Sequence, residues 1–339
     1  MGALARWTTA PGPADLRWIR VEEPSAAAGC RNAALAMAAR LGFAEARADE
    51  LAVAVTEAAS NLVKHARAGA MMLRCEPGGA APCIELVTVD GGPGIADVPA
   101  AARDGISTAG TLGIGLGAIR RAADFSAVFS LPGRGTVLAA RFAARRGDAG
   151  PAGWAGLIRP IGDEVECGDN YIAHRTGRGT TALLCDGLGH GPLAAAASRE
   201  AVAALREAPD DDPAALLRRV HARLARTRGG AVAIAAIAPK SVTFAGLGNV
   251  AGWILSGSGR QGMISVPGIA GHQARTFRQY SYELPPGAAV ILHSDGLSSR
   301  WNAADLPGLA SQDPLVIAAT LLREAGVHRD DAGILVLRP

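Results

Sequence analysis

The sequence contains very little lysine. Lys64 and Lys240 are its only lysines, although lysine and arginine together number 34 among the 339 residues. Neither lysine stands in a G-x-x-x-x-G-K-[ST] segment, which excludes a P-loop nucleotide site. The basic residues are spread along the chain and the net charge is only +3, so the sequence offers no basic stripe for a nucleic acid.

Long apolar runs and paired cysteines are also missing. No run reaches the roughly 20 apolar residues that a membrane-spanning helix needs, and residues 1–18 lack the apolar core of a secretory signal. We therefore expect a cytoplasmic protein without a membrane segment. The five cysteines form no C-x-x-C pair, which argues against a disulfide framework or a structural zinc site. We expect buried, reduced thiols.

The chain is long enough for two domains, and 49% of its residues are hydrophobic. Residues 146–156 are rich in Gly, Ala and Arg without apolar periodicity, so we interpret them as a linker. In the first domain, residues 1–145, strands and helices alternate in an order typical of one helix layer on a mixed sheet. In the second, residues 157–339, strands dominate, which indicates two antiparallel sheets with helices packed outside.

A helical stretch at 46–66 carries polar residues along one face. Glu57 and Asn61 are four residues apart and therefore lie one turn apart on the same side, and His65 continues the stripe. A carboxylate, an amide and an imidazole do not form the salt-bridging charge pattern of an ordinary solvated face. This face is a candidate ligand-binding surface.

Two glycine-rich segments follow this helix. Asp90 ends an apolar strand in VDGGPGI, where Gly92 and Gly94 let a flat ligand approach the backbone. Three further glycines directly precede a helix, namely Gly113, Gly115 and Gly117. The N–H groups at a helix N-terminus attract phosphate. A dinucleotide fingerprint does not fit, because no clear parallel strand precedes this loop and no acidic residue follows about 20 positions later.

The second half of the chain contains aspartates at the ends of apolar segments. If Gly177 and Arg178 form a two-residue hairpin turn, Asp169 and Asp186 lie directly opposite each other. A glycine at the first turn position suits a type II′ turn. Two facing carboxylates repel each other, and no basic residue in the immediate segment offsets them. A divalent cation shared by the two carboxylates would offset this repulsion, since such ions prefer oxygen ligands.

Further aspartates extend this predicted metal centre. Asp295 ends another apolar strand, Asp330 and Asp331 precede the last strand, and the carbonyl of Gly187 is placed to join the ligands. Two Mg²⁺ or Mn²⁺ ions a few ångströms apart would orient and deprotonate a water for attack on a phosphate.

Two histidines lie within these segments. His190 either donates a proton to a leaving serine or only shapes its GHG turn. His293 is expected to be a core or hydrogen-bonding residue.

The first set of motifs resembles the GHKL ATP-binding family, in particular its small RsbT-like anti-sigma-factor serine kinases. The resemblance covers roughly residues 15–145 and includes Gly135-Thr136, which is similar to the closing GT of the family. It implies a Bergerat α/β sandwich that binds ATP with Mg²⁺. Glu57 would then activate the hydroxyl or water, Asn61 would bind Mg²⁺, and Asp90 would bind the adenine amino group. The implied cofactor-binding residues are Asn61, Asp90, Gly92, Gly94, Gly113, Gly115, Gly117 and Thr136.

The second set resembles the PPM-type metal-dependent serine/threonine phosphatases, in particular the small SpoIIE/RsbX branch. The resemblance spans residues 157–339 and implies an αββα sandwich with two Mn²⁺ or Mg²⁺ ions. Asp186 would be the catalytic residue that bridges both ions. The implied metal ligands are Asp169, Asp186, Gly187, Asp295 and Asp330. Asp331 takes the place usually given to a polar neighbour, and a metal role for it stays open.

Together the resemblances imply an α+β protein that acts as a bifunctional partner-switching regulator in signal transduction and stress response. One domain would phosphorylate a serine of a STAS-type antagonist or stressosome-like protein, and the other would dephosphorylate phosphoserine or phosphothreonine. A sigma factor or another downstream regulator would be the end point. The alternatives are an ATP-gated partner-binding module with an attached phosphatase, and a phosphatase with a non-catalytic ATP-binding domain.

Overall fold

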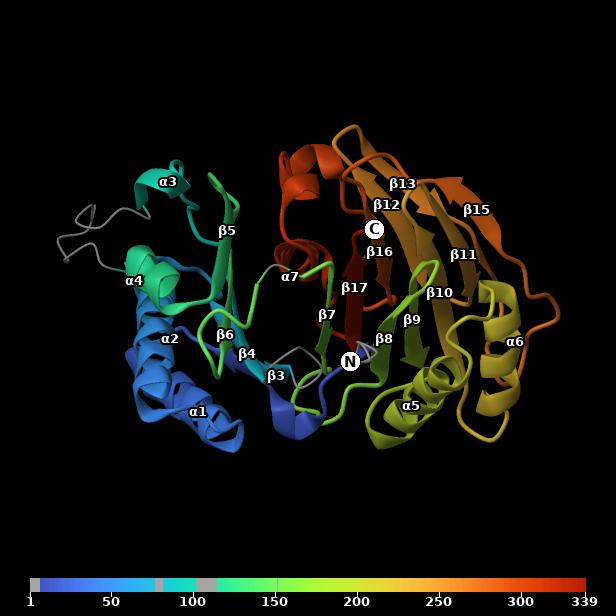
Figure 1. Ribbon diagram of the computed structural model, residues 1–339, viewed down its shortest axis with the longest axis horizontal. Helices are drawn as coiled ribbons and strands as arrows, with labels where there is room; N and C mark the ends of the chain where they lie inside the picture. The colour runs from blue at the N-terminus through green and yellow to red at the C-terminus, as the bar shows by residue number, and fades with distance from the viewer. Residues whose placement is uncertain (1–6, 77–81, 102–114, 151) are drawn as a thin grey trace. The chain divides into compact units, whose positions relative to one another are not determined.

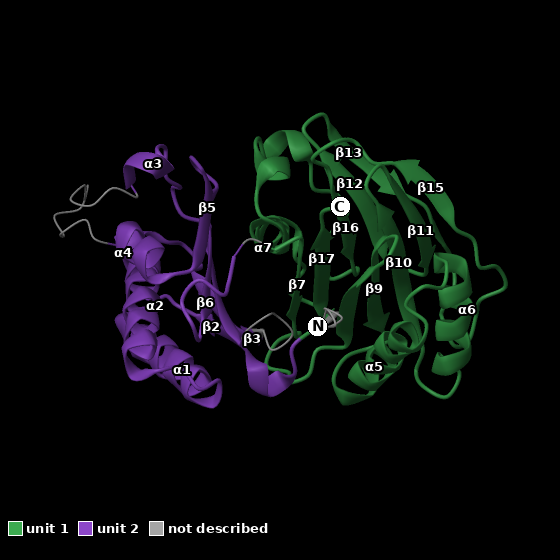
Figure 2. Ribbon diagram, in the orientation of Figure 1, with its two compact units in different colours: residues 1–10, 152–339 green, residues 11–151 purple. Residues whose placement is uncertain are grey.

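The computed structural model describes residues 7–76, 82–101, 115–150 and 152–339. These residues fall into two compact units, each with its own sheets and helices (Figures 1 and 2). Unit 1 contains residues 7–10 and 152–339, and unit 2 contains residues 11–150.

Unit 2 is a single five-stranded sheet covered on one face by helices (Figure 1). Its strands are β2 (Leu16–Arg20), β3 (Ala70–Glu76), β4 (Cys83–Val89), β5 (Phe125–Leu131) and β6 (Gly135–Ala143). Its helices are α1 (Pro24–Arg40), α2 (Glu45–His65), α3 (Val98–Ala101) and α4 (Gly115–Ala122), and a short 3-10 helix, Pro13–Asp15, precedes β2. The strand order is β2-β3-β4-β6-β5, and each of these pairs is antiparallel. The mixed sheet expected from the sequence is therefore wrong, while the single helix layer is confirmed.

The helix layer forms because α1 and α2 each present small and apolar side chains to the sheet. In α2, Leu51, Val55 and Leu62 recur at helical spacing and are buried. They pack against a sheet face that includes Leu73 and Leu86. The same periodicity leaves Glu57, Asn61 and His65 outside this core, which is why α2 both supports the fold and carries the candidate polar face.

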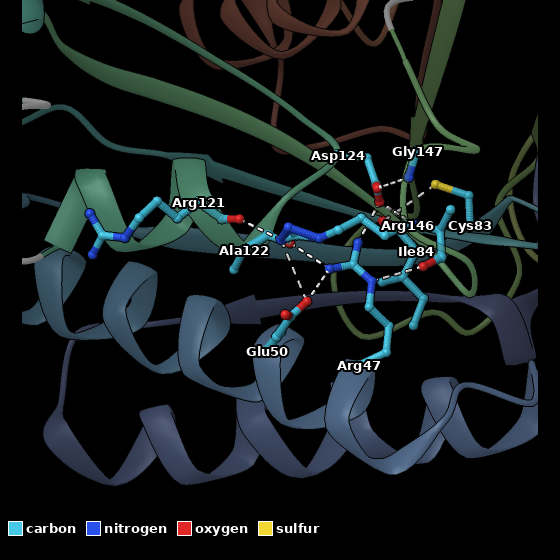
Figure 3. A network of polar contacts seen from close by, with 10 residues as sticks. Arg47, Glu50, Cys83, Ile84, Arg121, Ala122, Asp124, Arg146 and Gly147 are labelled. Carbon is cyan, nitrogen blue, oxygen red and sulfur yellow. Dashed lines mark hydrogen bonds and ion pairs between the residues drawn. The ribbon is translucent and has the colours of Figure 1, made fainter.

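A buried arginine ties the start of α2 to the rest of unit 2. Arg47 is 6% exposed, and its guanidinium donates to the carbonyls of Ala122 at 2.6 Å and Ala143 at 3.0 Å (Figure 3). It also forms ion pairs with Glu50 and with the buried carboxylate of Asp124. Because Ala122 is the last residue of α4 and Ala143 the last residue of β6, this one side chain connects α2, α4 and the end of β6.

Replacing Arg47 by Ala leaves the carboxylate of Asp124 buried without this ion-pair partner. We expect the free energy of unfolding of unit 2 to fall by about 3 kcal/mol, as for other buried ion pairs that lose one member. Urea denaturation of the full chain measures the change. Arg31→Ala, at an exposed position of α1, is the matched control. Equal midpoints for the two variants would contradict this role for Arg47.

Unit 1 contains two sheets. The larger one includes β1 (Trp7–Thr9), β8 (Asp169–Thr176), β9 (Gly179–Gly187), β10 (Gly230–Ala238), β11 (Ser241–Leu247), β14 (Ser265–Val266) and β15 (Tyr280–Glu283). The smaller one has the order β13-β12-β16-β17-β7, formed by β13 (Gly259–Met263), β12 (Ala251–Ser256), β16 (Ala289–His293), β17 (Ala332–Leu337) and β7 (Trp154–Arg159). Two short 3-10 helices, Ala303–Asp305 and Leu309–Ser311, follow β16.

The two sheets of unit 1 pack face to face between outer helices. The helices α5 (Pro192–Glu207) and α6 (Pro213–Leu224) cover the larger sheet, and α7 (Pro314–Ala325) covers β7 and β17 of the smaller one (Figure 1). Strand β17 lies against β8 and β9 across the layers. The four-layer αββα order expected from the sequence is confirmed, and it brings the ends of β9, β16 and the segment before β17 toward one another.

The first described strand belongs to unit 1 rather than to the unit that follows it in sequence. Strand β1 pairs antiparallel with β8, with Thr9 opposite Ile172. The hydroxyl of Thr8 accepts a hydrogen bond from the indole of Trp154 at 2.8 Å. Unit 2 is therefore inserted between β1 and β7 of unit 1. Strand β7 begins at Trp154, within the stretch interpreted as a linker.

Candidate metal centre and nucleotide site

The hairpin β8–β9 places two carboxylates directly opposite each other. Its register pairs Asp169 with Asp186 and Thr176 with Gly179, so Gly177 and Arg178 form the two-residue turn. This register was predicted from the sequence and is confirmed. The predicted type II′ turn is wrong, because the positive φ falls on Gly179, at 146°, and not on Gly177.

Asp169 is buried at the centre of this arrangement. Its side chain is 2% exposed, and its Oδ2 accepts a hydrogen bond from the hydroxyl of Ser294 at 2.5 Å. Its Oδ1 is also buried and has no hydrogen-bond partner among the described residues. Burial, and next the negative charges of Asp331 and Asp295, raise the pKa of Asp169 to about 8.

The pKa of Asp186 is raised even further than that of Asp169. Burial raises its pKa to about 10, with further contributions from the charge of Asp169 and from the charge and hydrogen bond of Asp295. A buried carboxylate costs free energy when it ionises without a compensating positive charge. The two facing strands therefore hold oxygen ligands in a setting that favours a bound cation.

Two further aspartates reach the same region from other strands. Asp295 follows β16 and is exposed, and its Oδ2 accepts a hydrogen bond from the Asn249 side chain at 2.7 Å. Asp330, just before β17, is partly buried, and this burial together with the charge of Asp295 raises its pKa. The structure thus brings Asp169, Asp186, Asp295 and Asp330 close enough to interact electrostatically.

Asp331 plays a different part from its neighbour. It is buried, and its Oδ1 and Oδ2 accept hydrogen bonds from the backbone N–H groups of Ile161 and Gly168, each at 2.7 Å. These bonds fix the segment that leads into Asp169. Asp331 therefore positions this segment through its two hydrogen bonds.

The strand that delivers Asp295 is braced by aromatic and basic side chains. His293 is buried and accepts a hydrogen bond from the Trp253 indole at 3.1 Å, while its other ring nitrogen lies 2.8 Å from the carbonyl of Ser294. Arg260 stacks on Trp253 and Trp301, with its guanidinium carbon 4.0 and 4.4 Å from their ring centroids. His293 is thus a hydrogen-bonded core residue, as predicted.

His190 lies on the exposed side of the same region. Its Nδ1 is 3.1 Å from Oε1 of Glu164. The flanking Gly189 and Gly191 both have positive φ, so the backbone turns sharply on either side of the imidazole. The charge of His190 also lowers the pKa of Asp330, which places it close to the carboxylates.

The donor chemistry fits a hard divalent cation. The four carboxylates offer only oxygen, and one of the buried oxygens, Oδ1 of Asp169, lacks a partner in the described part of the chain. Within the same described residues, no group of three or more carboxylate, imidazole or thiol side chains is arranged so that it could hold a metal ion by itself. An open, carboxylate-lined centre of this kind leaves room for backbone carbonyls such as that of Gly187 and for water.

Without divalent ions, the raised pKa values make the protein less stable as the pH increases. The contribution from protonated Asp169 is complete below its unfolded pKa near 4 and is lost as the pH rises through about 8. In EDTA, the wild type should therefore melt at a lower temperature at pH 8 than at pH 5. Asp169→Asn should melt about 2 °C or more above the wild type at pH 8 and close to it at pH 4.

Differential scanning calorimetry across this pH range checks the expectation. Asp210→Asn changes an exposed aspartate in another part of the sequence and is the control. Its melting temperatures should match those of the wild type. If Asp169→Asn also melts at the wild-type temperature at pH 8, ionisation of the buried Asp169 carboxyl does not destabilise the protein as described.

The candidate nucleotide site in unit 2 is built around Asp90. Its backbone N–H donates to the carbonyl of Thr136 at 3.0 Å, and its Oδ1 accepts a hydrogen bond from the N–H of Gly92 at 2.7 Å. Gly135 has φ 79°, and a side-chain carbon there would collide with the carbonyl of Asp90. The glycine therefore allows the adenine-type and closing motifs to meet. Gly94 packs against the carbonyl of Leu131 at the same place.

The α2 face lies beside this loop. A side-chain carbon at Gly92 would lie 2.7 Å from the carbonyl oxygen of His65, and one at Gly115 would lie 3.1 Å from the amide nitrogen of Asn61. Glu57 is half-buried one turn before Asn61. Gly117 is buried in α4, whereas Gly113 lies outside the described residues. The described motifs thus converge from α2, the end of β4, the start of α4 and the start of β6.

Comparison with known proteins identifies both halves. The histidine kinase-like ATPase domain family matches residues 21–142. The serine/threonine-protein kinase RsbT of Bacillus subtilis (strain 168) is 31% identical over 104 residues, which cover 31% of this chain and 78% of RsbT. The chain belongs to the RsbT family of histidine kinase-like ATPases. It also contains a domain of the stage II sporulation protein E (SpoIIE) family, which matches residues 176–339.

Solved structures resemble the SpoIIE-family half. A chain from "The bacterial stressosome: a modular system that has been adapted to control secondary messenger signaling" is 25% identical, with a TM-score of 0.50 over 55% of this chain and 98% of that chain. RsbX in complex with magnesium is 19% identical, with a TM-score of 0.48 over 54% of this chain and 92% of that chain. The expected histidine kinase-like ATPase domain and PPM-type phosphatase fold are both confirmed.

All five cysteines are buried and free of disulfides, as expected. None of the helices in the described ranges combines the length and apolar character needed to cross a bilayer.

Sequence reasoning missed several side chains that organise the metal centre. Ser294 and Asn249 hold Asp169 and Asp295, and neither was singled out. A signal for Ser294 was present, because it stands next to Asp295 at the end of an apolar strand. The sequence signal for Asn249 was weaker, because it is only a polar residue in the turn between two apolar strands.

Proposed function

We propose that this protein is a cytoplasmic, bifunctional partner-switching regulator. Unit 1 removes phosphate from phosphoserine or phosphothreonine of a protein, and unit 2 transfers phosphate from ATP to a serine of a partner. The observation that carries the phosphatase half is the burial of Asp169, with one unpartnered oxygen, directly opposite Asp186. The kinase half is supported by the relation to RsbT.

Two Mn²⁺ or Mg²⁺ ions would occupy the centre in unit 1. The residues that would hold them are Asp169, Asp186, the carbonyl of Gly187, Asp295 and Asp330. When bound, such ions supply Lewis acidity that lowers the pKa of a water and offsets charge on the phosphate. The raised pKa values of Asp169 and Asp186 then return to the ionised range, because a nearby positive charge favours the carboxylate.

The protein groups around the centre have separable tasks. Ser294 and Asn249 orient the carboxylates of Asp169 and Asp295 through single hydrogen bonds. Asp331 fixes the loop before Asp169. His190, whose ring contacts Glu164 on the solvent side, would hold a proton near the leaving group.

Asp186→Asn should abolish the phosphatase activity. We expect a loss on the order of 100-fold or more in the release of phosphate from a phosphorylated STAS-type protein with Mn²⁺, because Asp186 would be one of the residues that hold the ions. Asp210→Asn should release phosphate at the wild-type rate. Equal rates for Asp186→Asn and the wild type would overturn the phosphatase assignment, as would release that continues unchanged in EDTA.

In unit 2, the proposed roles follow the positions of the described motifs. Asp90 would bind the adenine amino group, with Gly92, Gly94 and Thr136 shaping the pocket around it. Asn61, next to the start of α4, would hold Mg²⁺ near the phosphates that Gly113, Gly115 and Gly117 receive. Glu57 would accept the proton of the attacking serine.

Two substitutions on α2 separate binding from transfer. Asn61→Ala should weaken the binding of Mg²⁺-ATP in calorimetry. Glu57→Ala should bind ATP normally and slow phosphoryl transfer to the partner by about 10²–10⁴-fold, the usual contribution of a general base. Lys64→Ala, at an exposed position of the same helix, is the control. If Glu57→Ala transfers phosphate as fast as the wild type, unit 2 does not work through this base.

The partner is inferred from the relatives. The match to RsbT and the likeness to a stressosome protein both support a STAS-type antagonist or stressosome-like protein as the phosphoprotein substrate. A sigma factor or another downstream regulator would then receive the signal. If the wild type binds ATP and a STAS-type protein but transfers no phosphate, unit 2 is an ATP-gated binding module instead.

A further inference from the structure

Arg228 lies in the turn between α6 and β10, beside the loop that follows Asp186. A side-chain carbon at Gly189 would lie 3.0 Å from Nη1 of Arg228, so the guanidinium rests against the loop that follows Asp186. Gly189 has φ 89° and carries no side chain, which leaves this space to the arginine.

The adjacent sheet register places Arg228 at the same end as Asp186. Strand β10 pairs with β9 so that Ala231 lies opposite Asp186 and Gly230 opposite Gly187. Arg228 comes two residues before Gly230. The carbonyl of Gly189, in turn, lies 3.3 Å from the carbon that a side chain at Gly168 would add, directly before Asp169.

The turn that carries Arg228 is anchored on both sides. The carbonyl of Gly229 accepts a hydrogen bond from the N–H of Leu188 at 3.0 Å, and the N–H of Gly229 donates to the Thr227 hydroxyl at 3.0 Å. The Thr227 hydroxyl also bonds to the carbonyl of Leu224 at 2.8 Å. These bonds hold the backbone of the turn next to the 187–191 loop and leave the guanidinium exposed.

No ion pair or hydrogen bond engages the Arg228 side chain within the described ranges, although arginines elsewhere on the surface are paired, as in Arg199–Glu166 and Arg219–Asp211. The imidazole of His190, by contrast, lies within hydrogen-bond distance of Glu164. Arg228 thus presents an uncommitted planar set of donors next to the predicted reaction centre.

Charge balance gives this arginine a task. The four carboxylates Asp169, Asp186, Asp295 and Asp330 would already offset the four positive charges of two divalent ions, and the nearby carboxylate of Asp331 adds a further negative charge. A phosphoserine adds about −1.5 to −2 charges, which this centre does not offset. A guanidinium beside it offsets part of that charge and matches the phosphate oxygens with paired N–H donors.

We propose that Arg228 is the phosphate-binding residue of unit 1 and contacts the phosphoryl oxygens that face away from the carboxylates. This inference rests on the proposed phosphatase function. It assigns to the α6–β10 turn the recognition of phosphate, as distinct from the carboxylates, which are placed to hold metal ions. The class of ligand is a phosphate monoester on a protein, and inorganic phosphate shares its recognised group.

Binding of inorganic phosphate to the full chain in the presence of Mg²⁺, measured by isothermal titration calorimetry, tests the proposal directly. Arg228→Ala should weaken this binding by about 10-fold or more, the usual loss for a charge-assisted hydrogen bond. Arg228→Lys should lose less, because it keeps the charge without the planar donors. Arg226→Ala, which removes another exposed arginine two residues away, should bind phosphate as the wild type does.

Enzyme kinetics distinguish the proposed phosphate binding by Arg228 from the proposed phosphatase function on which it rests. With a phosphorylated substrate protein, Arg228→Ala should raise KM and the inhibition constant for inorganic phosphate, with the melting temperature unchanged. Equal phosphate affinity for Arg228→Ala and Arg226→Ala overturns the assignment, and so does a wild type that binds no phosphate. A wild type that binds phosphate through Arg228 but hydrolyses no phosphoprotein overturns the phosphatase function alone.

Discussion

The unfavourable meeting of two acidic side chains across β8 and β9 is the constraint on which unit 1 depends. Ordinary sheet pairing fixes Asp169 opposite Asp186, and the second sheet then buries Asp169. The surrounding layers respond with specific contacts. Ser294 bonds to one oxygen of Asp169, and Asp331 uses both of its own oxygens to fix the preceding loop. The fold thus brings together carboxylates whose negative charge it does not itself neutralise, which is the condition for an ion-dependent centre.

Unit 2 reaches its site by a different route. At this site, α2, the Asp90 loop and the start of β6 meet through backbone, because glycines allow them to touch. The Arg47 network supports the other end of α2, away from these contacts. One helix therefore carries a rigid anchor at its first turns and the candidate nucleotide face toward its last turns. The two units therefore form their candidate sites in different ways. Unit 1 buries facing carboxylates, and unit 2 uses glycines to leave room for a ligand.

Much of this organisation could be predicted from the sequence, because it depends on short-range patterns. The apolar periodicity of α2 and the two-residue turn at 177–178 were sufficient to place Glu57 beside Asn61 and Asp169 opposite Asp186. The sequence did not show contacts that form only in three dimensions. Strand order brings Ser294 to Asp169, and a turn anchored by backbone bonds brings Arg228 to the loop that follows Asp186. An isolated serine or arginine has no periodic signal in the sequence. The all-antiparallel sheet of unit 2 was missed for the same reason, since pairing direction depends on chain crossings.

The placement of β1 has a consequence for how the protein is made. The ribosome releases this strand before unit 2, yet its partner β8 emerges only after all of unit 2 has been synthesised. Unit 2 can fold as a contiguous segment while β1 still lacks its strand partner. Closure of the larger sheet is then a late, long-range step, and such pairings form slowly. The early strand also makes unit 1 discontinuous in the gene, so excising the kinase-like segment as a cassette leaves both of its flanks in the same domain.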